Sequence, residues 1–443
     1  MLILSQIHSL ASKSIDFTLA YSQADIKTSI YLYPPQGIEL AGGNHRTVLK
    51  LKKNLYGLKD ARRTWWEHLS SGLSSLGFVP SESNPYIWIK NDMIIVSYVD
   101  DCLVFSNDKR KIKETLDKLK NQGFVFTDEG SIEQYLRIQI ENNSDGSITM
   151  SQPFLLKRII EALPGLKDAN PANIPALLMV ILTKDKDGKP RKGTWNYRSV
   201  IGMLNFLTNS THPEIAYAVH QCTRFCETPK YSHEMAVHQI VKYLLSTEKE
   251  ESKYNKTLSK FKGMTYRPNK NQGLEVYVDA SFAGDWNKLY SEEPSSVMSR
   301  TGFVIKYMNC PIYWTSKLQT EIALSTTEAE YIALSHSMRE VIPMLTLIQE
   351  IHEKMSIPNP SKTCATKCTV FEDNNGCIEL ANCPRLRPRT KHIGIKYHHF
   401  RSKVLDGTIK ILPIDTKDQQ ADIFTKPLPR DQFRKLRQLL IGW

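Results

Sequence analysis

The 443-residue sequence contains no apolar run long enough to cross a membrane. Its first residues, "MLILSQIHSL", have no basic segment and too short an apolar stretch for a secretory signal peptide. There is also no internal repeat and no long low-complexity segment, so a repeat architecture is not indicated. These absences argue against a membrane-bound or secreted protein.

Cysteine is scarce for a chain of this length, with eight residues in all. Two pairs lie close in sequence, Cys222 with Cys226 and Cys364 with Cys368, but neither has the two-residue gap of a zinc knuckle. We therefore expect reduced cysteines in a cytosolic or nuclear protein, and neither a disulfide framework nor a zinc site.

Acidic residues are outnumbered by basic ones, 46 to 58, which gives a formal net charge of +12. Such an excess favours a polyanionic partner such as a nucleic acid. The hydrophobic content of 41% and charged content of 23% are typical of a soluble globular protein. The length predicts two or three domains, because a single core seldom grows this large.

The pattern of apolar residues divides the chain into three segments. Residues 1–150 mix strand-like runs with one charged helix, which is an α+β pattern. Residues 151–268 are mostly helical, and the polar stretch "TYRPNKNQG" predicts a linker. From residue 269 strands return, followed by a long helix near residues 328–355 that Pro343 is expected to interrupt.

Two adjacent acids, Asp100 and Asp101, lie between the apolar runs of "MIIVSYVDDCLVFS". Burying unpaired carboxylates is unfavourable, and neighbouring ones raise each other's pKa. A divalent cation with a preference for oxygen ligands, such as Mg²⁺, would relieve both effects. Asp16 in "SIDFTLAY" is a candidate third ligand on a neighbouring strand. A solvated Asp-Asp turn is the alternative.

A second set of acids lies at predicted element ends in the C-terminal segment. Each member alone is explained by a helix cap or a solvated helix position. Their order is strand acid, helix acid, strand acid and late helix acid: Asp279, Glu330, Asp373 and Asp422. Glu328 lies two positions from Glu330, and a helix cannot point both side chains inward.

The first segment resembles the reverse transcriptase of copia-type LTR retrotransposon polyproteins. The words that carry the resemblance are "IDFTLAYSQADIKTSIYLYPPQG", "LKLKKNLYGLKDARRTWW" and "YVDD". The resemblance implies a palm in which Asp16, Asp100 and Asp101 are catalytic and in which Asp16 and Asp100 hold two Mg²⁺ ions about 4 Å apart. It also implies substrate contacts by three residues of these motifs: Tyr21, Gly57 and Tyr98. For Tyr21, which would exclude a ribose 2′-hydroxyl, an ordinary core tyrosine is the alternative.

The C-terminal segment resembles the ribonuclease H of the same polyproteins through "STTEAEYIAL", "RTKHIGIKYHHFR" and "ADIFTKPL". The resemblance implies that Asp279, Glu330, Asp373 and Asp422 bind two Mg²⁺ ions and activate water against an RNA phosphodiester. The place of Glu330 in its motif selects it over Glu328. Substrate contacts with phosphate are expected from three basic residues, with an ordinary solvated face as the alternative: Lys391, His392 and Arg401.

The sequence departs from the family pattern at several positions: Asp60, Arg62, Arg137 and Ser281. Only about fifteen residues precede Asp16, whereas the family has a fingers subdomain there. We therefore expect a polymerase module that is truncated at its front and impaired in this chain alone. The ribonuclease H quartet, in contrast, is complete.

The resemblance extends from about residue 9 to about residue 433. It predicts an α+β and α/β multidomain chain with a palm at 1–150, a helical thumb/connection at 151–268 and a ribonuclease H-like mixed sheet at 269–433. The expected partners are template RNA, a DNA primer, an RNA–DNA hybrid and dNTPs, in cytoplasmic virus-like particles or the nucleus. Two alternatives stay open: a non-catalytic nucleic-acid-binding remnant, decayed or retained by a host, and an unrelated metal-dependent nuclease with one active centre.

Overall fold

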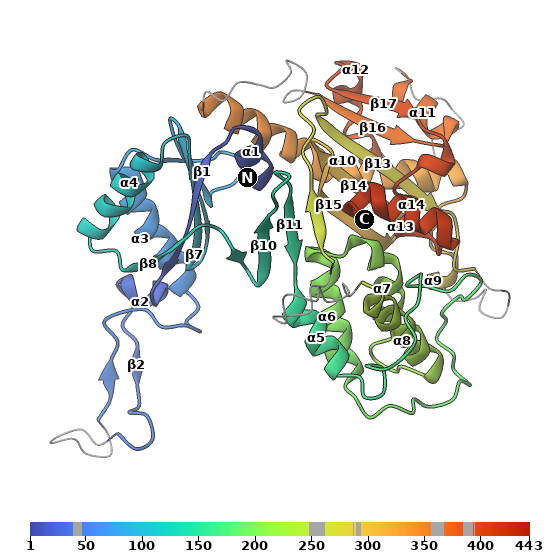
Figure 1. Cartoon of the computed structure of the whole chain (residues 1–443), viewed down its shortest axis with the longest axis horizontal. Coiled ribbons are helices and arrows are strands. Elements are labelled where there is room, and N and C mark those ends of the chain that lie inside the picture. The colour runs from blue at the N-terminus through green and yellow to red at the C-terminus, as the bar shows by residue number, and fades with distance from the viewer. Residues whose placement is uncertain are drawn as a thin grey trace. The chain divides into compact units, whose positions relative to one another are not determined.

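The structure is a computed structural model of the whole chain. It describes residues 1–38, 47–247, 262–286, 288, 294–355, 367–383, 393 and 395–443. The chain divides into two compact units, Met1–Leu136 with Leu347–Pro358, and Arg137–Thr346 with Asn359–Trp443. Both units contain helices and strands, so the chain is a mixed α/β protein, as the sequence predicts (Figure 1).

The first unit is built on a sheet with the strand order β4-β5-β6-β7-β1-β8 (Figure 1). Every neighbouring pair in this sheet is antiparallel. The strands are β1 (Ala11–Phe17), β4 (Val79–Pro80), β5 (Ile87–Lys90), β6 (Met93–Tyr98), β7 (Asp101–Ser106) and β8 (Phe126–Gly130). Because β1 lies beside β7, the segments "SIDF" and "YVDD" are neighbours in the sheet.

One face of this sheet carries the core of the first unit. Ile15 and Phe17 of β1 belong to that core, whereas Asp16 between them is partly exposed. Successive side chains of a strand point to opposite faces, so Asp16 lies on the face of the sheet opposite this core. Helices α3 (Ala61–Ser75) and α4 (Lys109–Asn121) pack their apolar side chains into the same core.

Helix α4 shows why a highly charged segment folds here. Its apolar residues Ile112, Leu116 and Leu119 recur at helical spacing and are all buried. Each such side chain contributes about 1.5–3 kcal/mol by leaving water. Asp108 caps the helix by accepting a hydrogen bond from the Arg110 N–H at 2.8 Å. The shorter elements of the unit are α1 (Leu2–Ile7), α2 (Ala20–Gln23), β2 (Tyr31–Leu32), β3 (Leu49–Lys50) and β9 (Gln134–Tyr135).

The second unit begins with two antiparallel strand pairs and a group of helices. Strand β11 (Ile148–Ser151) pairs with both β10 (Ile138–Asn142) and β12 (Met264–Tyr266). The helices are α5 (Pro153–Glu161), α6 (Tyr197–Ser210), α7 (Ala216–Thr223) and α8 (Tyr231–Leu245). Thr265 and Tyr266 had been predicted as part of a linker, but they are paired in β12, because their register with β11 satisfies their backbone groups.

A mixed sheet with the strand order β15-β14-β13-β16-β17 forms the rest of the second unit (Figure 1). Its strands are β13 (Leu274–Ser281), β14 (Arg300–Tyr307), β15 (Cys310–Leu318), β16 (Cys368–Glu372) and β17 (Ile409–Pro413). Strands β13, β14 and β15 are antiparallel neighbours, whereas β13, β16 and β17 run parallel. Val276 and Val278 of the central strand β13 are fully buried, as expected of a strand inside a sheet with packed faces.

Several helices accompany this sheet, and one of them differs from the sequence prediction. They are α9 (Pro294–Val297), α10 (Thr326–Lys354), α11 (Asn375–Asn382), α12 (Arg401–Leu405), α13 (Asp422–Thr425) and α14 (Arg430–Ile441). Helix α10 had been expected to be interrupted at Pro343, yet it continues through that residue. Val341 and Leu345, which lie on either side of the proline, are both buried. Packing of these side chains therefore stabilises the helix on both sides of Pro343.

Within the described residues, no helix combines the length and the apolar composition needed to span a bilayer. The predicted domain boundaries near residues 150 and 268 stay a prediction.

Candidate active site

Three acids of the first unit meet where β6 turns into β7. Asp16 lies directly opposite Asp101 in the register of β1 and β7, and Asp100 occupies the turn itself. The turn consists of Val99 and Asp100, between the paired residues Tyr98 and Asp101. Val99 has a φ of +60°, and a positive φ at the first central residue is what a type II′ hairpin turn requires. A β-branched residue is strained in this conformation, so surrounding contacts must hold the turn.

Two hydrogen bonds from neighbouring elements fix the backbone of this turn. The indole Nε1–H of Trp65 on α3 donates to the Val99 carbonyl oxygen at 2.8 Å. The backbone N–H of Phe17 on β1 donates to the Asp100 carbonyl oxygen, also at 2.8 Å. The position of the acidic turn is therefore set by the helix and by the strand that carries Asp16.

Tyrosine side chains surround the first acidic group. The Tyr56 hydroxyl donates to an Asp100 carboxylate oxygen at 3.3 Å, and its ring lies 4.4 Å from the Tyr21 ring, measured between centroids. Tyr56 precedes Gly57, whose φ of +96° lies in the region that favours glycine. Tyr98 is more than half exposed. Tyr21 and Gly57, both predicted substrate contacts, thus lie next to Tyr56, which sequence reasoning missed.

The electrostatics of the first group follow from like charges near one another. Burial, then the charges of Asp100 and Glu129, raises the pKa of Asp16. Burial raises the pKa of Asp101, and the charges of Asp100 and Asp16 add to the effect. Asp16, Asp100 and Asp101 are only partly buried, so water still solvates these carboxylates.

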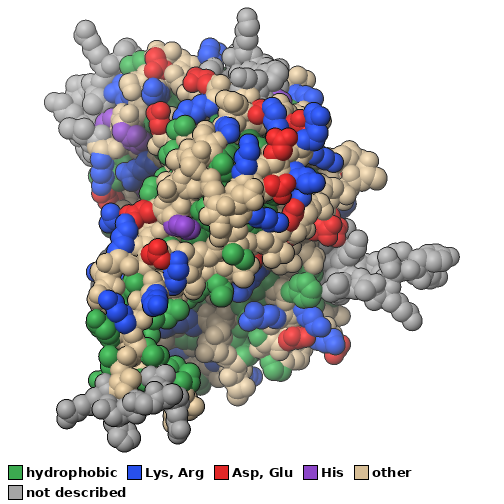
Figure 2. Space-filling model, turned by 90° about the vertical axis from the view of Figure 1, so that its left-hand side faces the viewer, with side chains coloured by type: hydrophobic (Ala, Val, Ile, Leu, Met, Phe, Trp, Pro, Cys, Tyr) green, Lys and Arg blue, Asp and Glu red, His purple; other side chains and the backbone are tan. Residues whose placement is uncertain are grey.

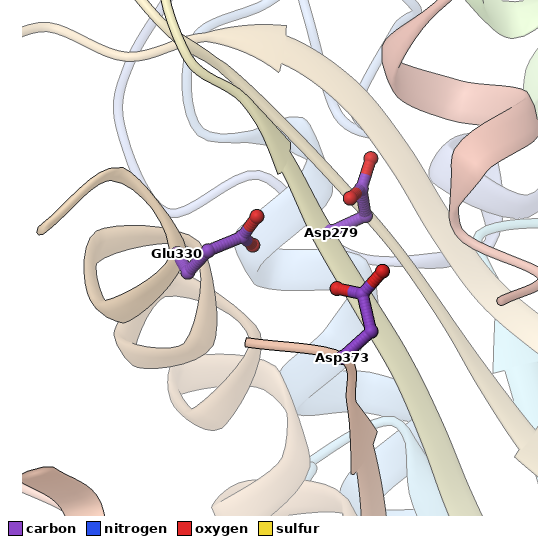
Figure 3. A group of neighbouring side chains, drawn as sticks. All are labelled: Asp279, Glu330 and Asp373. Atoms are coloured by element: carbon purple, nitrogen blue, oxygen red, sulfur yellow. The ribbon is translucent and has the colours of Figure 1, made fainter. Parts of the chain in front are cut away.

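Three acids of the second unit converge on one point (Figure 3). Asp279 lies near the end of β13, Asp373 directly follows the parallel strand β16, and Glu330 projects from the first turns of α10. One oxygen atom from each of the three carboxylates lies within 4.8 Å of the other two. Among the described residues no other three acids bring their carboxylate oxygens within 4.8 Å of one another. The carboxylates of Asp16, Asp100 and Asp101 therefore lie farther apart as a group.

The fourth predicted acid, Asp422, reaches the same region from α13. Lys426 Nζ lies 2.8 Å from Asp422 Oδ1 and 3.9 Å from Asp279 Oδ2, so one lysine links the two carboxylates. The Thr425 hydroxyl donates to the Asp279 carboxylate. Helix α13 can approach β14 this closely because residue 302 is glycine, where an added Cβ would lie 2.5 Å from the Thr425 side chain.

Burial dominates the electrostatics of this second group. It raises the pKa of Asp279, against the opposing attraction of Lys426, and it raises the pKa of Glu330 well above its ordinary value. The pKa of Asp422 is raised to about 7 by burial and then by the charge of Asp279. Removing carboxylates from water disfavours their charged form. The single charge of Lys426 does not offset this effect, so the group has too little positive charge nearby to keep all its carboxylates ionised.

A divalent cation fits the donors present at this point. The converging side chains supply only carboxylate oxygens, which are the ligands that Mg²⁺ prefers. Glu330 Oε2 is buried and has no hydrogen-bond partner among the described residues. A buried polar atom without a partner is costly, and a cation would satisfy it.

Comparison with known proteins identifies the family. Residues 1–178 match the family described as "Reverse transcriptase (RNA-dependent DNA polymerase)". The chain is 31% identical over 441 residues to the retrovirus-related Pol polyprotein from transposon TNT 1-94 of Nicotiana tabacum, which covers 97% of this chain and 30% of that protein. The chain belongs to the copia-type retrotransposon polyproteins.

Further relatives of this copia-type chain agree with that result. The retrovirus-related Pol polyprotein from transposon RE1 of Arabidopsis thaliana is 29% identical over 427 residues, or 95% of this chain and 27% of that protein. A putative transposon Ty5-1 protein of Saccharomyces cerevisiae is 27% identical over 339 residues, or 74% of this chain and 100% of that protein. The chain thus spans about 30% of the length of the plant polyproteins that it matches.

Glu372 is a buried acid of the copia-type chain that sequence reasoning missed. It directly precedes Asp373 and is fully buried at the end of β16, where burial raises its pKa to about 8. Its Oε1 accepts a hydrogen bond from the Asn374 N–H at 3.0 Å. The available signal was an acid beside the motif aspartate in "FEDNN". Glu328, the alternative to Glu330, accepts from the Leu324 N–H at 2.7 Å and so caps its own loop.

The predicted phosphate contacts of the copia-type chain stay predictions. Lys391 and His392 lie outside the described residues. Arg401 begins α12, and its guanidinium donates to the Cys383 carbonyl oxygen, so part of its donor capacity is used within the protein. A phosphate contact by Arg401 stays a prediction.

Proposed function

We propose that the chain is the reverse transcriptase and ribonuclease H region of a copia-type retrotransposon. It would copy element RNA into DNA and cleave the RNA strand of the resulting hybrid. The observation that carries the nuclease half is the convergence of Asp279, Glu330 and Asp373 within 4.8 Å, with a buried Glu330 oxygen that has no hydrogen-bond partner in the described part of the chain.

The topology of the second unit supports the nuclease assignment. Three antiparallel strands are followed by two parallel ones, and β13 and β16 end at the same edge of the mixed sheet. Helix α10, which carries Glu330, lies in sequence between β15 and β16. This arrangement fits a ribonuclease H-like domain over residues 269–433, preceded by a helical thumb/connection over 151–268.

The polymerase half rests on the reverse transcriptase match and on the β1, β6 and β7 strands. We assign the palm to residues 1–150, with Asp16, Asp100 and Asp101 as its catalytic acids. The Tyr21 ring, which packs against the Tyr56 ring at a tilt, would lie under the sugar of an incoming dNTP and disfavour a 2′-hydroxyl.

Mg²⁺ is the cation that these acids fit, and in each centre it would stabilise the charge that develops in phosphoryl transfer. In the second centre Asp279, Glu330, Asp373 and Asp422 would hold the cations. Lys426 keeps Asp279 and Asp422 oriented by pairing with both, and Thr425 fixes one rotamer of Asp279. Thr416 donates to Asp373 Oδ2 at 2.9 Å and positions that carboxylate.

The surface charge is consistent with a nucleic-acid partner. The net charge of +12 favours phosphate, and on the face shown in Figure 2 the Lys and Arg side chains are spread among the acidic ones. Because the excess on this face is spread rather than gathered, we expect many weak phosphate contacts and a steep loss of hybrid affinity with salt.

The deciding experiment compares two neighbouring glutamates of one helix. The purified chain, given an RNA–DNA hybrid labelled on its RNA strand, should release RNA fragments when Mg²⁺ is present. Glu330→Gln should remove this activity, and Glu328→Gln should keep it, because Glu328 is turned to the Leu324 backbone. Hybrid binding without any cleavage by the parent chain would instead favour a non-catalytic remnant. Cleavage that survives Glu330→Gln would place the nuclease elsewhere.

A further inference from the structure

A short turn of residues 282–286 follows strand β13 directly, and its first residue, Phe282, lies three positions after Asp279. A chain of three residues spans at most about 11 Å, so Phe282 lies within that distance of the acidic centre. A nucleic-acid duplex carries one phosphate per strand about every 3.4 Å along its axis. Contacts from this turn would therefore fall within about three nucleotides of a bond held at Asp279.

The turn has a fixed shape. The Trp286 N–H donates to the Ala283 carbonyl oxygen at 2.9 Å, and the Ala283 N–H donates to the Ser299 hydroxyl at 3.3 Å. Ala283 itself has a φ of +45°. At Gly284 an added Cβ would lie 1.8 Å from the Ser281 hydroxyl oxygen, so a side chain cannot be placed there without a shift.

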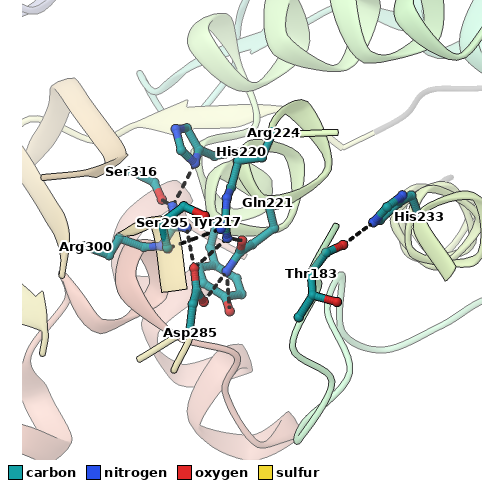
Figure 4. A network of polar contacts seen from close by, with 10 residues as sticks. All are labelled: Thr183, Tyr217, His220, Gln221, Arg224, His233, Asp285, Ser295, Arg300 and Ser316. Carbon is teal, nitrogen blue, oxygen red and sulfur yellow. Dashed lines mark hydrogen bonds and ion pairs between the residues drawn. The ribbon is translucent and has the colours of Figure 1, made fainter. Parts of the chain in front are cut away.

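Asp285 anchors the turn to helix α7 and strand β14 (Figure 4). Its carboxylate lies 2.7 Å from Arg224 and 3.4 Å from Arg300, and it accepts from the Gln221 amide at 2.7 Å. Arg300 Nη1 is 2.8 Å from His220 Nδ1, and burial together with both arginines lowers the pKa of His220 to about 3. The neutral imidazole therefore adds no charge.

This buried group, Asp285 with Arg224 and Arg300, has two guanidinium groups and one carboxylate. It holds one surplus positive charge at the turn, which is complementary to phosphate. Asp285 and Arg300 are buried, and Arg224 is mostly so.

Two aromatic side chains project from this anchored turn into solvent. Phe282 is 42% exposed and Trp286 is 51% exposed. Single exposed apolar side chains are common and need no explanation. Two large aromatic side chains on one anchored turn, which follows the strand of Asp279 and contains Asp285, form a surface suited to the sugars and bases of a nucleic acid.

We propose that Phe282 and Trp286 are nucleic-acid contact residues of the nuclease centre. Their rings pack against the sugars of an RNA–DNA hybrid in its wide, shallow minor groove, while the surplus charge of the Asp285 group attracts the adjacent phosphates. The proposal rests on the proposed nuclease function. It assigns this turn the task of setting where the hybrid lies relative to Asp279.

The first test measures hybrid affinity without divalent cations, so that no cleavage occurs. Phe282→Ala and Trp286→Ala should each weaken binding about five- to tenfold, in the range that loss of one ring contact produces. The matched control is Phe206→Ala, because Phe206 is 41% exposed on α6 and has no place in this turn. Unchanged affinity in both turn variants, or an equal loss in the control, would overturn the proposal.

The second test separates a contact from a folding defect. Trp286→Phe keeps an aromatic ring and should bind the hybrid within about twofold of the parent. It should also lose the part of the fluorescence quenching by the hybrid that Trp286 provides. With Mg²⁺ present, Phe282→Ala should raise KM by the same five- to tenfold and change kcat little.

The two proposals fail in different ways. A parent chain that binds the hybrid but never cuts it would refute the nuclease, while the affinity measurements would still judge the turn. A kcat that falls with unchanged KM in Phe282→Ala would contradict a contact role.

Discussion

The two acidic centres of this chain share residue types and differ in their surroundings. In the first, Asp16, Asp100 and Asp101 lie at a strand turn, partly exposed, with a tyrosine hydroxyl as the hydrogen-bond donor to Asp100. In the second, Asp279 and Glu330 are buried, and a lysine lies between Asp279 and Asp422. Burial is therefore the main physical difference between the centres.

This difference indicates when each centre becomes complete. Solvated carboxylates can remain ionised and spaced apart until a cation and a nucleic acid draw them together. Buried carboxylates already held within 4.8 Å repel one another, so a cation there stabilises the fold as well as the reaction. The comparison predicts that the second centre is the one whose stability depends strongly on Mg²⁺.

The largest expected effect separates the centres by activity. Asp373→Asn should reduce hybrid cleavage by about a thousandfold or more, as happens when one member of a jointly acting catalytic set is removed. Asp100→Asn should leave cleavage within about twofold of the parent, because Asp100 belongs to the other unit. Gel assays that follow cleavage of the labelled hybrid by the two variants measure both effects. Equal losses would mean that the centres act as one.

A smaller effect concerns the ion pairs that support each region. Asp285→Ala leaves Arg300, only 2% exposed at its side chain, without its carboxylate, and should lower the unfolding free energy by about 3–5 kcal/mol. Lys13→Ala removes the partly exposed pair with Asp128 on β1 and β8 and should cost less than about 1 kcal/mol. Urea titrations of the two variants give both values. A cost at Lys13 as large as that at Asp285 would contradict the contrast in burial.

The last effect is the dependence of stability on pH and Mg²⁺. The folded-state pKa values of about 7 for Asp422 and about 8 for Glu372 exceed the unfolded values near 4. The folded state therefore holds more protons between pH 4 and 8, so the metal-free chain should lose stability as pH rises through that window and level off above it.

Mg²⁺ should reverse this loss at neutral pH, by about 2.7 kcal/mol at a hundred times its Kd. Thermal unfolding at several pH values, with and without Mg²⁺, measures both effects. Glu330→Gln should diminish the Mg²⁺ response, and Asp16→Asn should not. A response that depends on Asp16 alone would reverse the comparison.

Much of the second centre could be predicted from local sequence. Asp279, Glu330 and Asp373 were named in advance from their order along the chain and from the family resemblance of the words around them. The parallel pairing of β13 with β16 then explains why the two strand acids reach the same sheet edge. Lys426 could also have been found, since it lies four positions after Asp422 within the motif "ADIFTKPL".

The remaining contacts depend on packing between distant segments. Arg224 precedes Asp285 by 61 positions, and no local pattern pairs them. Glu372 was missed because its burial depends on the packing of the assembled sheet and not on its neighbours in sequence. Helix α10 continues through Pro343 because residues on both sides of the proline are buried. Thr265 and Tyr266 of β12 were assigned to a linker because the polar residues that follow them hide their pairing with β11.

The hydrogen bond from the Trp65 indole to the strained Val99 turn makes that proton a spectroscopic reporter. Trp65 is almost fully buried, so its indole N–H is shielded from bulk water and its chemical shift depends mainly on this one acceptor. In a chain with ¹⁵N-labelled tryptophan, ligands that engage the Asp100 turn will move this signal. Ligands confined to the second centre will leave it in place, which lets one resonance report on which centre is occupied.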